Sequence, residues 1–333
     1  MSNLAPPLLL ARPGLVWAAG IAAALGLLAT IGVAFRSSLR TRIWAKMSSA
    51  ERRDLLALVA ATAALTLLPD HPLDRFGLLN PFMFGRLAVV VMALSGAGYF
   101  AQRFMGARFG LLVSGLAAGF ISSTAAVVAM GARSREQPAL AAAGAAGAIA
   151  SLLGSLAYLT VILAAVSPAL IRDLAAPLGL SALLLSLCAG WMTRGAEGTR
   201  SEATVPGGRP FRLTTVGLFV VLVGGFSVAS EVLILWLGAP AMLVGAGIMG
   251  LADAHAAAVS LANLAADGKL SASLASLGVA VTLTANMVIK IPAALLTGAP
   301  GYTRRVAIGV AALLGGLWAG WAITQALPVL RGG

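Results

Sequence analysis

Two short polar segments lie inside long apolar runs of the chain, where a charged side chain costs about 3 kcal/mol at the centre of a bilayer. The first, GFISSTAAVVAM, carries three consecutive hydroxyls at Ser122, Ser123 and Thr124. The second, GLADAHAAAVSL, carries an acid and an imidazole at Asp253 and His255. Carboxylates and imidazoles bind and release protons and small cations, and hydroxyls can line a polar path. The two segments together predict a site for a small cation or a proton.

The apolar run that follows the acidic segment adds two second-line candidates, Asn286 and Lys290. Lys290 lies near the end of its run, so its ammonium could either reach the membrane interface or take part in the site. It could also form a structural ion pair with Asp253, in which case neither charge would serve a ligand. The sequence leaves these alternatives open.

Spacing restricts how the acid and the imidazole can act together. Residues two positions apart diverge by about 200° on a regular helix, so Asp253 and His255 cannot bind one metal ion from an unbroken helix. Gly245, Gly247 and Gly250 precede them and would allow a break in the helix or the close approach of a neighbour. The hydroxyl segment also has a structural alternative, because helical Ser and Thr can bond to the carbonyl one turn earlier and lie in a close helix contact.

Covalent chemistry is not indicated by any motif. The chain has no H-E-x-x-H run, no phosphate-binding glycine loop and no G-x-S-x-G, and its only histidines are His71 and His255. We therefore expect no enzymatic activity, no catalytic residues and no cofactor. The single cysteine, Cys188, excludes an internal disulfide framework and a multi-cysteine metal site.

The composition is that of a membrane protein. Hydrophobic residues make up 59% of the 333 residues and charged residues 10%, against about 25% charged residues in soluble domains. The continuous apolar runs predict helices rather than the short alternating strands of a barrel. The net charge of +12 comes from basic residues in loops beside apolar runs, where they contact lipid headgroups and set topology, so we expect a lipid bilayer and no nucleic acid as partner.

We predict an all-α, multi-pass protein of the bacterial inner membrane with about ten spans. The second span is short and could be interfacial, which would leave nine. The predicted spans are 15–35, 54–69, 86–101, 109–131, 139–166, 177–192, 213–236, 240–262, 272–296 and 303–326. The Lys and Arg residues divide equally between the two sides, and the dense basic loop 36–53 favours a cytoplasmic position for its own side.

An internal repeat organises the second part of the chain. LLVSGLAAGFISSTAA (111–126) aligns without gaps on MLVGAGIMGLADAHAA (242–257), and LCAGW on LWAGW at nearly the same offset. We therefore predict two four-helix copies that run in the same direction, because corresponding spans are four apart. The resulting domain boundaries are 1–53 for a span and basic loop, 54–85 for a short span and polar loop, 86–192 for the first copy, 193–212 for a linker and 213–333 for the second copy.

An ordered set of short motifs carries a family resemblance: LLPD, LNP, SGAGY, RFMGARFG and GFISSTAAVVAM followed by RSR. Together they resemble the C-terminal membrane domain of MgtC/SapB-type proteins, a domain of unknown function numbered 4010, from about residue 50 onward. The MgtC half of such proteins, marked by a Gly-Leu-x-Arg-Glu run and a second Arg-rich motif, is missing or reduced here. The resemblance implies a helical membrane fold and, despite family names that refer to magnesium transport, no particular substrate.

Two functions from different classes remain at this point. In the first, the protein is a transporter of a small cation or a proton-coupled solute, with the two polar segments facing each other at the membrane midplane. In the second, it does not transport but binds and regulates a partner through helix faces, with small residues of the fourth and fifth spans packing against another chain. That hypothesis places Gly115, Gly119, Gly144 and Gly147 against another chain. A homo-oligomer is possible in either case. A membrane enzyme acting on a lipid is the weakest alternative, because no catalytic set is present.

Overall fold

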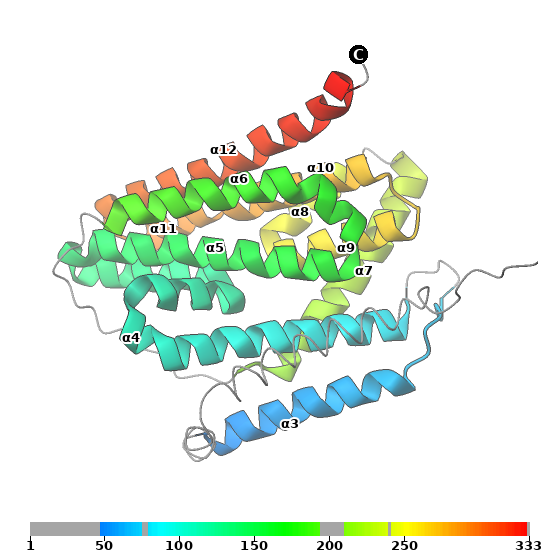
Figure 1. Ribbon diagram of the computed structural model, residues 1–333, viewed down its shortest axis with the longest axis horizontal. Helices are drawn as coiled ribbons and strands as arrows, with labels where there is room; N and C mark the ends of the chain where they lie inside the picture. The colour runs from blue at the N-terminus through cyan, green and yellow to red at the C-terminus, as the bar shows by residue number, and fades with distance from the viewer. Residues whose placement is uncertain (1–46, 75–78, 194–209, 239–240, 332–333) are drawn as a thin grey trace, which may run out of the picture. The chain divides into compact units, whose positions relative to one another are not determined.

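The computed structural model describes residues 47–74, 79–193, 210–238 and 241–331 (Figure 1). The predicted first span, 15–35, and most of the predicted linker, 193–212, lie outside these ranges. Internal contacts divide the chain into two units, Met1–Arg53 and Asp54–Gly333. In the described end of the first unit, Ser48 Oγ accepts from the Glu51 N–H and Glu51 Oε2 accepts from the Ser48 N–H, a reciprocal pair that starts a helix.

The described residues form helices and no strand. In chain order these are α3 (Ser49–Ala64), η1 (Leu65–Leu67), α4 (Pro81–Glu136), η2 (Pro138–Leu140), α5 (Ala141–Val166), α6 (Pro168–Thr193), α7 (Leu213–Leu237), α8 (Met242–Ala252), α9 (Ala254–Ala266), α10 (Ala272–Val288), α11 (Lys290–Thr297) and α12 (Pro300–Arg331). Proline at the first position starts α4, η2, α6 and α12, where its missing N–H costs no helical hydrogen bond. The LNP motif is one such start, because Asn80 caps α4 by accepting from the Met83 N–H.

Seven segments of the described chain are long and apolar enough to cross a membrane, so this is an all-helical membrane protein. They are Pro81–Phe100, Ser114–Glu136, Pro138–Val166, Pro168–Met192, Leu213–Leu237, Ala272–Thr297 and Pro300–Ala326. Besides 15–35, which lies outside the described residues, two of the ten predicted spans are not among them. Segment 54–69 falls in α3, which has 16 residues, and in η1, and segment 240–262 forms the two short helices α8 and α9.

Helix α4 is too long to be one straight crossing, and it folds back on itself. A side-chain carbon added at Gly98 would lie 3.0 Å from the carbonyl oxygen of Ala117 and still closer to Phe120. A straight helix would hold residues 98 and 117 about 28 Å apart. In Figure 1 the cyan start of α4 accordingly has the teal continuation of the same helix beside it.

A second reversal of α4 lies near Ser122. Gly115 is in backbone contact with Gly147 of α5, while a side-chain carbon at Gly144 would lie 3.4 Å from the carbonyl oxygen of Met130. Gly144 and Gly147 are less than one turn apart, whereas a straight helix would separate Gly115 from Met130 by about 22 Å. Residues 114–136 therefore enter and turn back, and we call them the Ser122 hairpin. Length and composition alone do not distinguish such a hairpin from a crossing helix.

The chain repeats this arrangement in α8 and α9, which we call the Asp253 hairpin. The helix breaks at Asp253, whose backbone is extended at φ −154° and ψ 109°. The side chains of Met242, at the start of α8, and Leu261, in α9, both lie within 3.5 Å of the position that a Cβ of Gly278 would occupy. A straight helix would hold them about 28 Å apart, so α8 and α9 must double back.

Helices at corresponding positions of the two predicted copies run in opposite directions. In α6 and α12, Gly316 contacts Ser181, and Gly320, one turn further on, contacts Pro177, one turn earlier. The Ser181 hydroxyl also donates to the carbonyl of Leu313 at 3.0 Å. Positions that rise along α12 therefore meet positions that fall along α6, and the two helices are antiparallel.

The second pair, the start of α4 and α7, is antiparallel as well. Gly96 faces Phe211, just before α7, and Gly224 faces Phe84. The prediction that corresponding helices run in the same direction is therefore wrong. It counted residues 109–131 and 240–262 as crossings, whereas each is a hairpin that leaves on the side where it entered. Without its hairpin, each predicted copy has three candidate crossings. After an odd number of crossings the chain is on the other side of the membrane, so the corresponding helices that follow run in the opposite direction.

The glycines that the second hypothesis assigned to a partner are used inside the chain. Gly115 lies against Gly147, and Gly119 lies against the α5 backbone at Ser151. Gly144 is within 4 Å of Met130 and Tyr302. These small residues bring the Ser122 hairpin and α5 into close contact, which leaves their helix faces covered by this chain.

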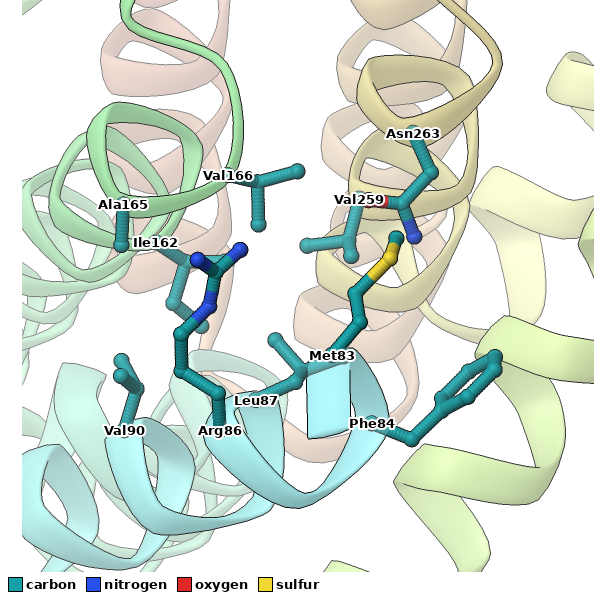
Figure 2. A pocket seen from close by; sticks show the side chains of 10 residues that line it. All are labelled: Met83, Phe84, Arg86, Leu87, Val90, Ile162, Ala165, Val166, Val259 and Asn263. Atoms are coloured by element: carbon teal, nitrogen blue, oxygen red, sulfur yellow. The ribbon is translucent and has the colours of Figure 1, made fainter. Parts of the chain in front are cut away.

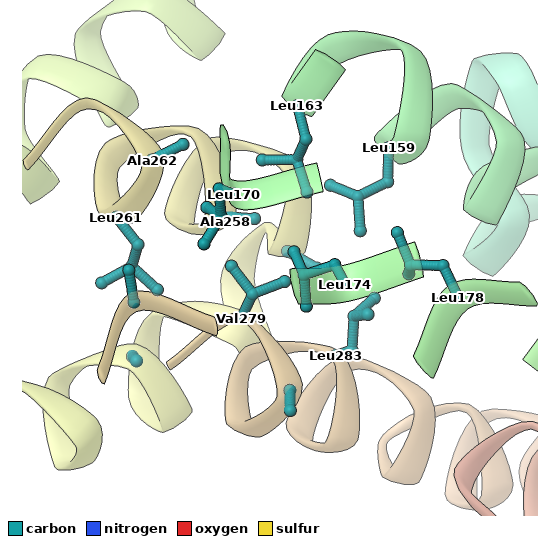
Figure 3. Close-up of a cluster of buried hydrophobic side chains, with 14 of the residues drawn as sticks. Leu159, Leu163, Leu170, Leu174, Leu178, Ala258, Leu261, Ala262, Val279 and Leu283 are labelled. Carbon is teal, nitrogen blue, oxygen red and sulfur yellow. The ribbon is translucent and has the colours of Figure 1, made fainter. Parts of the chain in front are cut away.

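The largest apolar cluster joins α5 and α6 to the second hairpin and α10. Leu159, Leu163, Leu174, Val279 and Leu283 meet there and are buried (Figure 3). The cluster holds α9 and α10 against α5. It thereby fixes one wall of the space in which the two hairpin tips meet.

Candidate functional site

A polar cavity of about 210 Å³ lies where the tips of the two hairpins meet. It contains all the predicted site residues except one: Ser122, Ser123, Thr124, Asp253, His255 and Asn286 line it. The first three come from the Ser122 hairpin and the next two from the Asp253 hairpin. The structure thus brings together two segments that are more than a hundred positions apart in the sequence. Lys290 is not part of the lining.

Asp253 has a structural task at the break between α8 and α9. Its Oδ1 accepts from the backbone N–H of His255 at 2.8 Å and of Ala256 at 2.9 Å. The side chain is therefore the N-cap of α9, which explains in part why an acid stands inside an apolar run. It nevertheless keeps 32% of its side-chain surface exposed, and it borders the cavity. Capping and ligand binding are compatible at this position.

His255 bridges the Asp253 hairpin and α5. Its Nε2 lies 3.2 Å from the Ser155 hydroxyl and 3.3 Å from the Ser155 carbonyl oxygen. Its Nδ1 lies 3.7 Å from Asp253 Oδ1. The Tyr158 ring packs edge to face on the imidazole, with 4.7 Å between ring centres. The two residues do not share a helix face, as the spacing required, and they meet only because the helix is broken between them.

The three hydroxyls of the Ser122 hairpin are arranged differently from one another. Ser122 Oγ accepts from the Ala125 N–H at 3.2 Å, which is the bond of an N-cap. Ser123 is 6% exposed, and its side chain lines the cavity. Thr124 is exposed and also lines it. The Ser122 contact differs from the predicted alternative, in which the hydroxyl donates to the carbonyl one turn earlier.

Lys290 lies behind the cavity and does not reach an interface. It is 0% exposed, and its Nζ donates to the Asn286 carbonyl at 2.9 Å and to Asn286 Oδ1. Asn286 in turn donates from Nδ2 to the Gly250 carbonyl at 3.1 Å, next to the break in the Asp253 hairpin. Two of the three sequence alternatives for Lys290 are therefore wrong: among the described residues it neither reaches an exposed position nor forms an ion pair with Asp253. For Lys290, a part in the site stays a prediction. Its ammonium is satisfied by the residue that lines the cavity.

Sequence reasoning missed four polar residues of this site: Ser95, Ser155, Tyr158 and Thr215. Three of them line the cavity, and Ser155 holds His255. The repeat alignment contained a signal for one of them, because its offset of 131 pairs Ser155 with Asn286, a residue already chosen.

A conventional metal centre is not present in the part of the chain that the structure describes. No group of three or more His, Cys, Asp or Glu side chains is close enough there to hold an ion. Asp253 and His255 are the acid and the imidazole of the cavity, and the remaining polar lining is hydroxyl and amide. The donor set suits a proton or a weakly bound solute better than a tightly held metal.

A second, much smaller cavity lies between α4, α5 and α9. Its volume of about 10 Å³ is roughly that needed for one water molecule. Arg86 and Asn263 face it from opposite walls among Met83, Val166 and Val259 (Figure 2). Asn263 Oδ1 is buried without a protein partner among the described atoms, so a single water is a suitable occupant. We assign this cavity to packing.

Comparison with known proteins adds a family but no activity. Residues 89–298 match the model of a family described as a domain of unknown function, DUF4010. No curated protein and no solved structure matches the chain. The match begins later than the resemblance, which started at about residue 50, but it includes both hairpins and every candidate site residue. Because it covers more than half of the sequence, the chain belongs to the DUF4010 family.

Proposed function

We propose that this protein is an integral membrane transporter that moves a small cation or a proton-coupled solute through the cavity between two inverted copies. One observation carries the proposal: two helical hairpins from different halves of the chain place their polar tips on the same cavity. Interrupted helices whose ends meet at a polar site are typical of secondary transporters. A protein that only packs against a partner has no need for such a cavity.

The repeat supports this proposal residue by residue. Ser122 and Asp253 are paired by the alignment, and each accepts a hydrogen bond from the backbone N–H three residues later, at the tip of its hairpin. Gly119 and Gly250 are also paired. Gly119 lies against Ser151 of α5 and Gly250 against Thr282 of α10, which are themselves 131 positions apart. Residues 86–192 and 213–333 thus use equivalent positions for equivalent contacts.

The antiparallel direction of the copies provides the mechanism. Copies of opposite direction are related by an axis in the membrane plane, so the fold presents a similar set of helices to each side. Rocking one copy against the other would open the cavity alternately to the two sides. The hairpins suit this motion, because each ends inside the membrane and can move without dragging a loop across it.

The charges around the cavity are compatible with reversible binding. Asp253 contributes a carboxylate, and Lys290 contributes an ammonium bonded to Asn286 behind the lining. These two opposite charges near one cavity reduce the cost of keeping either within the membrane. A cation or proton that enters changes this balance by one charge. We place the protein in the inner membrane of a bacterium.

The test is flux across a defined bilayer. Purified protein in proteoliposomes is exposed to imposed gradients of H⁺, Na⁺, K⁺ or Mg²⁺, and internal indicator dyes report the movement of each ion. We expect flux that Asp253→Asn abolishes, because asparagine keeps the cap of α9 but removes the charge.

The matched control is Asp173→Asn, which removes a carboxylate of α6 that does not line the cavity. Its flux should equal that of the unmodified protein. Equal flux in the Asp253→Asn protein would refute the assignment of the cavity as the transport site.

A further inference from the structure

We infer that Nδ1 of His255 is the proton-binding atom of the cavity, and that the carboxylate of Asp253 stabilises the bound proton. This inference deepens the proposed function by naming a coupling ion and the atom that holds it. It rests on the proposed function only in that the bound proton is coupled to transport. Protonation of one nitrogen can be measured without any flux.

The first step is the assignment of the other ring nitrogen. Nε2 lies 3.3 Å from the Ser155 carbonyl oxygen, and a carbonyl oxygen can only accept. Nε2 is therefore best occupied by a proton that points at this oxygen. The Ser155 hydroxyl at 3.2 Å can accept from the same proton. In the neutral imidazole this leaves Nδ1 without a proton and with a lone pair.

The second step is the environment of that lone pair. Nδ1 lies 3.7 Å from Asp253 Oδ1, so in the neutral state two acceptors face each other. A proton on Nδ1 replaces this repulsion with an attraction between opposite charges. Oδ1 is already held in place by the N–H groups of His255 and Ala256. The carboxylate is thus fixed beside the ring before the proton arrives.

The third step is the set of other groups that face the ring. From α5, Tyr158 packs edge to face on the ring. From α10, Asn286 lines the same cavity, and from α11 the ammonium of Lys290 lies behind it. The positive charge of Lys290 disfavours a positive charge on the His255 ring, and the negative charge of Asp253 favours it. Of the ionisable side chains that line the cavity, Asp253 is the one that carries a negative charge.

The chain offers an unusually clean measurement, because it has two histidines. His71 is exposed in the loop before α4, so His71→Gln leaves a single imidazole with little structural effect. Protein with this substitution, labelled with ¹⁵N-histidine and placed in lipid bilayers, reports both nitrogens of His255 by solid-state NMR. At pH 8.5 we expect a protonated Nε2 and a bare Nδ1, and on acidification to pH 5 we expect Nδ1 to gain a proton.

Asp253→Asn tests the partner. At the pH where His255 is half protonated in the His71→Gln protein, the added substitution should lower the protonated fraction about fivefold or more, because a neighbouring opposite charge favours the charged form. Ser155→Ala keeps the backbone carbonyl and should keep the Nε2-protonated form. Asp173→Asn should leave both spectra unchanged.

Three results would overturn the inference: a proton on Nδ1 at pH 8.5, a bare Nδ1 throughout acidification, or an unchanged fraction in Asp253→Asn. The first two need no substitution at the site, so they decide even if Asp253→Asn fails to fold. Flux with a His255 that never binds a proton would refute this inference and leave the proposed function standing. The expected spectra without any flux would support this inference and refute the proposed function.

Discussion

At the scale of single residues, Asp253 and Lys290 each hydrogen-bond to groups at the end of an interrupted helix. Asp253 caps a helix that starts inside the membrane, and Lys290 satisfies the oxygens of Asn286 at the junction of α10 and α11. Both lie where a helix is interrupted and free N–H or C=O groups are exposed. A charged group and an interrupted helix therefore stabilise each other, and the same pairing leaves polar groups facing the cavity.

A second cluster of charges lies near the loop between α9 and α10. Lys269 pairs with Glu231 at 3.4 Å, and Asp267 lies near both. Asp267 is exposed, but partial desolvation of its carboxyl raises its pKa, Lys269 counteracts this effect and Glu231 adds to it. Because the folded state has the higher pKa, Asp267 stabilises folding below its unfolded pKa of about 3.9, and this contribution is lost as pH rises through the folded pKa.

Asp267→Asn is therefore expected to raise the melting temperature at pH 7 and to have little effect near pH 3. The ionised carboxylate of Asp267 destabilises the folded state, and the amide removes it. Near pH 3 the carboxyl is already protonated, so the substitution changes little. Thermal unfolding of the detergent-solubilised protein at several pH values measures this difference. A variant that melts lower than the unmodified protein at pH 7 would show that Asp267 is held mainly by Lys269.

At the scale of elements, the hairpins depend on backbone contacts that only glycine allows. Gly250 lies against the backbone of Thr282, and Gly119 lies against that of Ser151. The adjacent Thr282 hydroxyl donates to the Ala246 carbonyl at 3.1 Å, which ties α8 to α10. Close approach is what brings each hairpin tip to the cavity, so these glycines determine the geometry of the site.

Gly250→Ala is expected to destabilise the protein by about 1–3 kcal/mol, because the added carbon would overlap a backbone that cannot move aside. The matched control is Gly225→Ala in α7, where nothing lies within 4 Å of the added carbon. That change should be neutral or stabilise by up to about 1 kcal/mol, since alanine has the better helix propensity. Thermal unfolding of the two variants provides the comparison, and equal destabilisation would contradict the assigned packing.

At the scale of the whole molecule, the decisive feature is the direction of the second copy. Antiparallel α6 and α12 place the start of one helix on the opposite side of the membrane from the start of the other. Two copies that run in the same direction would place both starts on one side. The difference separates a fold with two similar faces from one with two distinct faces.

Cysteine labelling tests this directly. In a Cys188→Ser background, Ala169→Cys and Gly301→Cys introduce single thiols at exposed positions near the starts of α6 and α12. A membrane-impermeant maleimide added to one side of sealed vesicles of uniform orientation should label one variant and not the other. Both should react after the membrane is permeabilised, and labelling of both from the same side would rule out the inverted arrangement.

Composition and local pattern alone predicted helices in a membrane and the polar segments at Ser122 and Asp253, and the ordered short motifs carried the family resemblance. These follow from short segments, because the cost of polar groups in lipid depends on residue type. Only the tertiary structure decided that residues 109–131 and 240–262 turn back, that α6 and α12 are antiparallel, and that His255 meets Ser155. A half-membrane hairpin and a crossing helix have the same apolar composition. Which of the two forms depends on distant neighbours, here α5 at Gly147 and Ser151 and α10 at Thr282, whose backbones contact the hairpins.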